Sequence, residues 1–191
     1  MRISGGGARG IPLTVPKGDM VRPATDGLRQ AVFSSLASRI PGARFLDLFA
    51  GSGAYGLEAL SRGAAGGIFV EKQPKATACL RHNLAAVCKS LNRGLDHLEI
   101  RQADALTAPL EVGVTAPALI FIDPPYEIIP EVAPRIFARF DLLLAASAST
   151  DTIVVFEAPG EIELTPAGWT CVKRLGKGGR QPTASFFRKE A

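Results

Sequence analysis

The chain has 191 residues, 47% of them hydrophobic, and carries 22 basic against 18 acidic side chains. This length suits one domain with a real core, and the apolar fraction excludes wholesale disorder. No stretch approaches about 18 uninterrupted apolar residues, and the first ten residues lack the apolar segment of a secretory signal peptide. We therefore expect no membrane span and no secretion signal.

The pattern along the chain predicts an N-terminal hairpin or extension over residues 1–24 and one larger domain over residues 25–191. Apolar runs that are bounded by turn residues predict strands, and apolar residues at helical spacing predict helices. The predicted helices span residues 25–39, 54–63, 74–91 and about 134–146. The predicted strands span residues 43–49, 66–71, 97–103, 118–123, 152–158, 168–175 and 183–189.

Strands alternate with helices through most of the larger domain, which predicts an α/β fold with helices on both faces of a mostly parallel, seven-stranded sheet. The last two predicted strands are separated by a short Gly-rich turn, so we expect them to be antiparallel. Ligand sites on such sheets lie beyond the carboxyl ends of the strands. The residues that follow each predicted strand are therefore the candidates for a ligand site.

A glycine-rich loop follows the first strand of this domain. Gly51, Gly53 and Gly56 satisfy the spacing GxGxxG, and Glu71 ends the next strand 20 residues after Gly51. In a nucleotide-like site the glycines let the backbone approach the ligand, and the acid accepts hydrogen bonds from ribose hydroxyls. A turn without a ligand is the simpler alternative.

Asp47 distinguishes between two ligands for this loop. A carboxylate at the mouth of a pyrophosphate site would repel the phosphates of NAD. S-adenosylmethionine carries a sulfonium and an ammonium group and no phosphate, so the loop favours that ligand. Asp104 follows the third strand, where it could accept a hydrogen bond from an adenine amino group or cap the next segment.

The fourth strand runs into Asp123-Pro124-Pro125-Tyr126. The two prolines restrict the backbone and remove two donors, so their carbonyl groups remain as acceptors. The Asp123 carboxylate and the Pro124 carbonyl could hold both N–H groups of an exocyclic amine while Tyr126 stacks on the base. This arrangement predicts methyl transfer to an amino group held close to the methyl donor. A plain loop is the alternative.

Charge is unevenly distributed along the chain. Residues 1–44 contain seven basic and two acidic residues, residues 45–170 nine basic and fifteen acidic, and residues 171–191 six basic and one acidic. Basic ends on an acidic body suit a polyanion such as nucleic acid, although terminal charges can also serve solubility alone. Cys79, Cys88 and Cys171 form no CxxC pair, which predicts reduced thiols, a cytoplasmic location and no metal site.

Together these residues resemble the RsmD family of bacterial small-subunit ribosomal RNA guanine-N2 methyltransferases, which have a Rossmann-like class I fold and depend on S-adenosylmethionine. The resemblance covers nearly the whole chain. The matching stretches are Met1-Arg2-Ile3 with Gly10, Arg22 to Asp26 with Arg29 and Phe33, Leu46 to Gly53, Gly56 to Ala64, Phe69-Val70-Glu71, Asn83-Leu84 and Asp123 to Tyr126.

The resemblance implies transfer of a methyl group from S-adenosyl-L-methionine to N2 of a guanine in small-subunit ribosomal RNA, within an assembling subunit. We predict a monomer with these site residues. The cofactor residues are Asp47, Phe49, Gly51, Ser52, Gly53, Glu71, Lys72, Asp104 and Ala105. The catalytic residues are Asp123, Pro124, Pro125 and Tyr126. The RNA-binding residues are Arg2, Arg9, Arg22, Thr25 and Arg29, on the N-terminal extension and the start of the next helix.

Three alternatives remain open at this point. An adenine-N6 methyltransferase of DNA or RNA would use the same chemistry, but the chain is short for a large target-recognition insertion. An NAD-dependent oxidoreductase would use the GxGxxG loop, but neither His82 nor His97 follows a strand. A non-catalytic RNA-binding module would use the basic ends and leave the Asp123 segment without a purpose.

Overall fold

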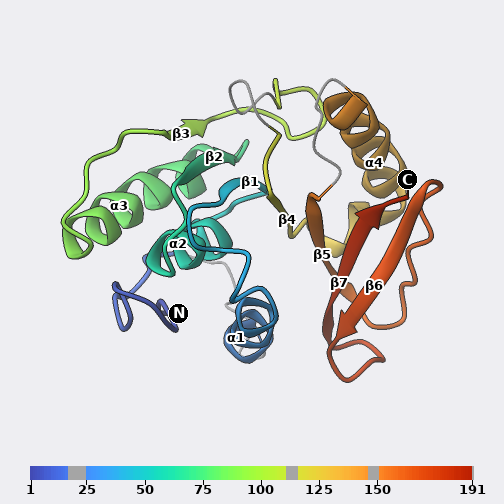
Figure 1. Ribbon diagram of the computed structural model, residues 1–191, viewed down its shortest axis with the longest axis horizontal. Coiled ribbons are helices and arrows are strands. Elements are labelled where there is room, and N and C mark those ends of the chain that lie inside the picture. Colours follow the sequence, from blue (N-terminus) through green and yellow to red (C-terminus); the bar gives the residue numbers. More distant parts are fainter. Residues whose placement is uncertain (17–24, 111–115, 146–150, 191) are drawn as a thin grey trace.

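Seven strands form one sheet in the computed structural model, which describes residues 1–16, 25–110, 116–145 and 151–190. The strands lie in the order β3-β2-β1-β4-β5-β7-β6 (Figure 1). Their bounds are β1 Arg44–Leu48, β2 Gly66–Val70, β3 Leu98–Arg101, β4 Leu119–Ile122, β5 Ile153–Pro159, β6 Trp169–Leu175 and β7 Pro182–Lys189.

Strands β1 to β5 pair in parallel, and β7 is antiparallel to both of its neighbours, β5 and β6. The predicted mostly parallel sheet with an antiparallel C-terminal strand is confirmed. β1 pairs with β2 on one side and with β4 on the other, so the strand order reverses at β1. A crevice forms outside the carboxyl ends of the strands at such a switch point, and ligands of open α/β sheets bind there.

Helices cover both faces of the sheet (Figure 1). The helices are α1 Thr25–Ser35, α2 Ala54–Ser61, α3 Pro74–Ser90 and α4 Ile129–Ala145, with the short 3-10 helix η1 at Tyr126–Ile128. α1, α2 and α3 pack on one face, and α4 packs on the other with the turn around residues 105–110. The first three helices of the larger domain therefore cover one face of the sheet, and the fourth covers the other.

Alternation along the buried strands decides which side chains enter each core, because successive residues of a strand point to opposite faces. Phe45 packs with the α1–α3 layer, and Leu46 and Leu48 pack with α4. Phe121 packs with the α1–α3 layer in the same way. Asp47 follows Phe45 by two residues and therefore points toward α2 rather than toward α4.

Two helix boundaries differ from the sequence prediction. α1 ends at Ser35, several residues before the predicted end, and a turn leads from it toward β1. α4 begins at Ile129 and contains Pro134, where the sequence suggested a start near Pro134. η1 runs directly into α4, and Pro134, the sixth residue of α4, removes one hydrogen bond near the start of the helix without ending it.

Residues 1–16 pack against the larger domain and share its core. Ile3, Ala8 and Leu13 are buried in the same hydrophobic cluster as α1, α2 and α3. The segment folds back on itself: the Ile3 amide donates to the Ile11 carbonyl at 3.0 Å, and Arg2 and Pro12 form an antiparallel bridge. In Figure 1 this segment lies beside α2.

None of the described helices is long and apolar enough to cross a lipid bilayer. Cys79, Cys88 and Cys171 are free thiols in this structure.

Candidate functional site

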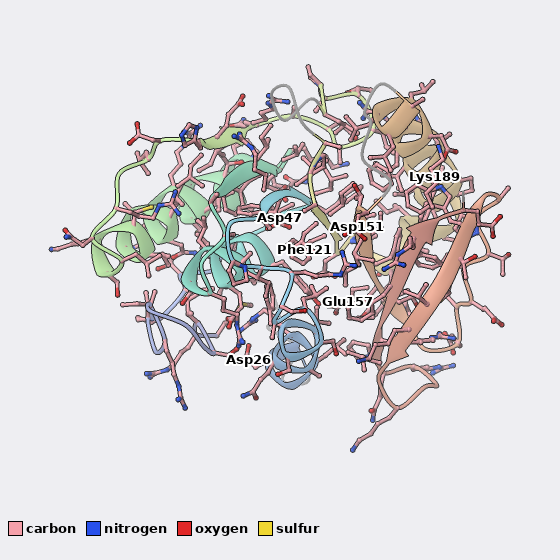
Figure 2. All side chains as sticks on the ribbon, viewed as in Figure 1. Asp26, Asp47, Phe121, Asp151, Glu157 and Lys189 are labelled. Atoms are coloured by element: carbon pink, nitrogen blue, oxygen red, sulfur yellow. The ribbon has the colours of Figure 1, made fainter. Side chains whose placement is uncertain are left out.

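Acidic side chains gather where the central strands end. Asp47 lies near the end of β1, Asp123 directly follows β4, and Glu157 lies near the end of β5. The register pairs Ile122 with Phe156, so the following residues, Asp123 and Glu157, stand next to each other on neighbouring strands. Figure 2 shows Asp47 and Glu157 near the middle of the molecule, on either side of Phe121.

The glycine-rich loop makes a tight connection from β1 to α2. Gly51 has φ 54° and Gly53 has φ 88°, and Phe49 also adopts a positive φ of 57°. A non-glycine residue such as Phe49 adopts this left-handed region at a cost in free energy, which its surrounding contacts must offset. The Ala50 amide donates to the Val70 carbonyl at 3.1 Å, which attaches the loop to the end of β2.

The glycines of this loop meet different surroundings. A Cβ at Gly53 would lie 2.4 Å from Leu80 Cδ1, and one at Gly56 would lie 2.3 Å from Phe69 Cε1. A Cβ at Gly51 would meet nothing nearer than the Phe49 carbonyl oxygen at 4.0 Å. The aromatic rings of Phe69 and Phe45 therefore require glycine at Gly56, the left-handed backbone favours it at Gly53, and the backbone at Gly51 stays open to a ligand.

Glu71 directly follows β2 and holds the loop. One carboxylate oxygen accepts from the Gly51 amide at 2.8 Å, and the other accepts from the Gln73 amide at 2.7 Å. A carboxylate offers about four acceptor positions, so Glu71 can bind these amides and still accept from ribose hydroxyls. The two bonds orient the carboxylate before any ligand arrives.

Asp47 is buried beneath the loop, and its Oδ2 accepts from the Gly56 amide at 2.8 Å. The pKa of Asp47 is raised to about 7: burial raises it most, the hydrogen bond from Gly56 lowers it in part, and the nearby Glu71 adds a smaller increase. A positively charged ligand would favour the ionised form. Asp47, Glu71 and Asp104 thus form an acidic set that suits a cationic, ribose-containing ligand such as S-adenosylmethionine.

The affinity for S-adenosylmethionine is expected to rise by up to about tenfold per unit as pH increases from 6 toward 7, because the cation binds the ionised Asp47 more tightly. Asp47→Asn should remove this dependence in calorimetry at pH 6 and 8, and the exposed Asp96→Asn should keep it. Equal wild-type affinities at both pH values would contradict the assignment.

The same raised pKa of Asp47 should make the ligand-free protein less stable as pH rises from about 4 to about 7, because the unfolded chain loses this proton first.

Asp104 takes one of the two roles considered for it, that of a cap. Its Oδ1 accepts from the Leu106 amide at 2.8 Å and caps the turn that follows β3, so the capping interpretation holds. Its Oδ2 lies 3.8 Å from Lys72 Nζ, and both side chains are partly exposed. Ala105 is buried, and its carbonyl accepts from Arg139 of α4, which attaches this turn to α4.

The Asp123-Pro124-Pro125-Tyr126 segment leaves the sheet at the switch point. The Asp123 amide approaches the Leu48 carbonyl of β1 at 3.5 Å, so the segment adjoins the strand that carries the glycine loop. Pro124 is buried, Pro125 is exposed, and Asp123 and Tyr126 are half-buried. Pro125 is extended, with φ −53° and ψ 134°, and its carbonyl accepts from the Ile128 amide at 3.2 Å.

Sequence reasoning missed two residues beside this segment, Tyr55 and Glu157. The Tyr55 hydroxyl donates to Glu157 Oε2 at 2.6 Å, and both side chains are buried. Burial raises the pKa of Tyr55 well above its usual value, and the negative charges of Glu157 and Asp123 add to the effect. A polar residue near the end of the apolar strand 152–158 was the available signal for Glu157; nothing local identified Tyr55.

The predicted RNA-binding residues separate into different environments. Arg2 and Arg9 are exposed on the N-terminal segment. Arg29 is 2% exposed, and its guanidinium contacts Asp26 Oδ1 at 3.0 Å and the Arg2 carbonyl at 2.6 Å. At this burial the Arg29 guanidinium is engaged inside the protein and offers almost no surface to RNA in this structure, unlike the exposed Arg2 and Arg9. Arg22 lies outside the described residues, and for Thr25 the structure describes only its place at the start of α1.

Glu58 of α2 anchors the N-terminal segment. It is fully buried and accepts from the Ser4 amide at 2.8 Å and the Ser4 hydroxyl at 2.7 Å. Its other contacts are Arg62 Nε at 2.9 Å and Arg29 Nε at 3.5 Å. Arg29 therefore serves as a structural partner of this carboxylate and of the N-terminal segment.

Comparison with known proteins supplies relatives for this arrangement. The sequence model of a family described as "Conserved hypothetical protein 95" matches residues 1–184. The ribosomal RNA small subunit methyltransferase D of Escherichia coli K12 is 40% identical over 126 residues, 66% of this chain and 60% of the relative. The protein of that name from Haemophilus influenzae is 28% identical over 180 residues, covering 93% of this chain and 89% of the relative.

Solved structures extend the comparison to the complete fold. The yhhF protein of Escherichia coli has a TM-score of 0.77 and is 31% identical, and the match covers 100% of this chain and 98% of that chain. TrmN from Thermus thermophilus has a TM-score of 0.63 at 25% identity, and this chain matches 48% of its length.

Proposed function

Because the chain belongs to the conserved hypothetical protein 95 family, we propose that it transfers a methyl group from S-adenosylmethionine to N2 of a guanine in small-subunit ribosomal RNA. Membership of this family agrees with the predicted resemblance to RsmD enzymes. One observation carries the proposal: Asp123 leaves β4 beside the end of β1, so an amine-binding segment adjoins an acidic, glycine-rich ligand loop.

The cofactor would lie along the ends of β1, β2 and β3. Glu71 would accept from the ribose hydroxyls, Asp104 from the adenine amino group, and Asp47 would favour the positive charges of the ligand. The open backbone at Gly51 supports close approach of the ligand. S-adenosylmethionine would supply an electrophilic methyl carbon on a sulfonium sulfur.

The Asp123 segment would hold the target amine. An exocyclic amino nitrogen is a poor nucleophile because its lone pair is delocalised into the base. Hydrogen bonds to the Asp123 carboxylate and the Pro124 carbonyl would favour a more tetrahedral nitrogen with its lone pair directed at the methyl carbon. As the nitrogen–carbon bond forms and the carbon–sulfur bond breaks, positive charge develops on nitrogen and the carboxylate stabilises it. The amine proton then passes to Asp123 or to water.

An RNA substrate also needs contacts for its target base and its phosphates. We propose that Tyr126 stacks on the target base after the base has left its helical partners. The exposed Arg2 and Arg9 and the additional Arg22 would bind RNA phosphates on the N-terminal side. With an RNA target within an assembling small subunit, the protein would act in the cytoplasm. It would act there as a monomer.

Calorimetry with S-adenosylmethionine and with NAD separates this proposal from the oxidoreductase alternative. We expect binding of S-adenosylmethionine and no measurable binding of NAD, because Asp47 would repel a pyrophosphate. Preferential binding of NAD would overturn the proposal.

The substrate is tested by mapping methylated nucleotides in ribosomal RNA from cells that lack this protein. One N2-methylguanine in the small subunit should disappear and return when the gene is restored. Loss of an N6-methyladenine instead would favour the adenine-N6 alternative, and an unchanged set of marks would contradict a role in ribosomal RNA methylation.

Replacing Arg2 and Arg9 by glutamate is expected to weaken RNA binding and to reduce the slope of log affinity against log salt by about 1 to 2. Both side chains are exposed, so folding should be preserved. The matched control reverses Arg135 and Lys189, which pair with Glu131 and Asp141 of α4. Filter binding at several salt concentrations checks the result, and an unaltered slope in the first variant would exclude phosphate contacts by these two arginines.

A further inference from the structure

Asn83 of α3 joins the N-terminal segment to the glycine-rich loop. Its side chain is fully buried. Oδ1 accepts from the Thr14 amide at 2.8 Å, and Nδ2 donates to the Thr14 carbonyl at 2.9 Å and to the Ser52 carbonyl at 2.9 Å. One amide group thus contacts two segments that lie 38 residues apart, and both Nδ2 hydrogens have partners.

The three bonds determine which way the amide faces. The Thr14 amide can only donate, so the Asn83 oxygen must face it, and the Asn83 nitrogen must face the two carbonyls. Because the group is buried, loss of any one bond would leave a polar atom without water as a substitute. Asn83 consequently holds the Ser52 carbonyl and Thr14 at a defined separation.

The segment that leads to Thr14 is also bonded to α2. The Gly7 amide donates to the Ser61 carbonyl at 2.7 Å, and the Ala8 amide donates to the Ser61 hydroxyl at 2.9 Å. These bonds attach it to α2, the helix that begins directly after the glycine-rich loop. The N-terminal segment is therefore bonded to Ser61 at the end of α2 and, through Asn83, to Ser52 of the loop that precedes α2.

We propose that Asn83 is a positioning residue that couples RNA binding on the N-terminal segment to the order of the cofactor loop. RNA that binds Arg2 and Arg9 restrains the segment, and the Thr14–Asn83–Ser52 contacts pass this restraint to Ser52, between Gly51 and Gly53. Each ligand, once bound, reduces the conformational entropy that the protein loses when the other ligand binds, so the two bind cooperatively. This inference rests on the proposed function, because it requires both ligands to bind this chain.

The test measures affinity for S-adenosylhomocysteine with and without small subunits isolated from cells that lack the protein. The wild type should bind S-adenosylhomocysteine at least about fivefold more tightly when the subunits are present. Linkage requires the subunits to bind more tightly by the same factor when S-adenosylhomocysteine is present.

Two variants divide the contacts of Asn83. Thr14→Pro removes the N–H that donates to Asn83 and keeps the Thr14 carbonyl and the Asn83 bond to Ser52, so affinity for S-adenosylhomocysteine alone should stay within about twofold while the coupling falls to about half or less. Asn83→Asp keeps an acceptor for Thr14 but loses both donors, so it should also weaken S-adenosylhomocysteine binding by about tenfold. Asn92→Asp introduces the same charge at an exposed residue and should behave as the wild type.

Hydrogen exchange provides a readout that does not depend on either variant folding. Adding subunits to the wild type should slow exchange of the amides in residues 50–57. Unchanged exchange there, or full coupling in Thr14→Pro, would overturn the coupling role. A wild type that binds neither S-adenosylhomocysteine nor the subunits would instead overturn the proposed function, and this inference with it.

Discussion

Replacing Asp123 by alanine is expected to lower the rate of methyl transfer by about a thousandfold or more. The carboxylate is proposed to hold the amine, to stabilise positive charge on nitrogen and to accept a proton, and such interactions typically contribute a hundredfold or more each. Single-turnover transfer of a labelled methyl group to unmodified small subunits measures the effect. Asp123→Asn keeps one acceptor oxygen and should retain more activity than alanine.

Binding of S-adenosylmethionine separates this chemical role from a structural one. Asp123 adjoins the glycine loop but is not one of the residues expected to hold the cofactor, so the affinity of Asp123→Ala should stay within about tenfold of wild type. Glu127→Gln changes a neighbouring exposed carboxylate and should leave the rate unchanged. Wild-type turnover by Asp123→Ala would remove this residue from the mechanism.

Replacing Glu58 by alanine is expected to lower the free energy of unfolding by about 3 kcal/mol, because the buried Arg29 then loses its buried carboxylate partner and keeps the exposed Asp26. Glu58 is fully buried, and Arg29, whose Nε lies 3.5 Å away, is 2% exposed. The variant also loses both hydrogen bonds from Ser4, so the N-terminal segment should exchange its amide hydrogens faster. Urea unfolding and hydrogen exchange measure the two effects.

The control for Glu58 is another glutamate that pairs with an arginine four residues later. Glu131 and Arg135 are 2.8 Å apart, but their side chains are 70% and 53% exposed. Exposed pairs of this kind contribute about 0.2–1 kcal/mol, so Glu131→Ala should be almost as stable as wild type. If Glu58→Ala were equally stable, the burial of this ion pair would not contribute to holding the N-terminal segment.

The catalytic hypothesis depended on features that are local in the sequence. The glycine loop and the Asp123 segment each follow an apolar run, and carboxyl ends of parallel strands must meet at one edge of the sheet. A strand–helix alternation was therefore enough to predict that these two segments come close. The same reasoning could not predict the neighbours of Asp123, because strand order is not local information.

Charged and polar residues with distant partners were the least predictable. Arg29 was predicted to bind RNA because it is basic and lies near the N-terminus, yet the structure buries it against Glu58. Asn83 belonged to a recognisable stretch without any assigned task, and its partners Thr14 and Ser52 lie 69 and 31 residues away. Whether a charged side chain lies on the surface or in the core depends on such distant partners.

By itself, the amino-acid sequence determined the strands, the helices and the acidic and glycine-rich segments at the strand ends, because periodicity and turn chemistry act over a few residues. Only the tertiary structure decided that β7 lies between β5 and β6, that Glu157 stands beside Asp123, and that Asn83 joins Thr14 to Ser52. These contacts arise when the two faces of the sheet are covered and buried polar groups must find partners, which depends on the packing of the whole chain.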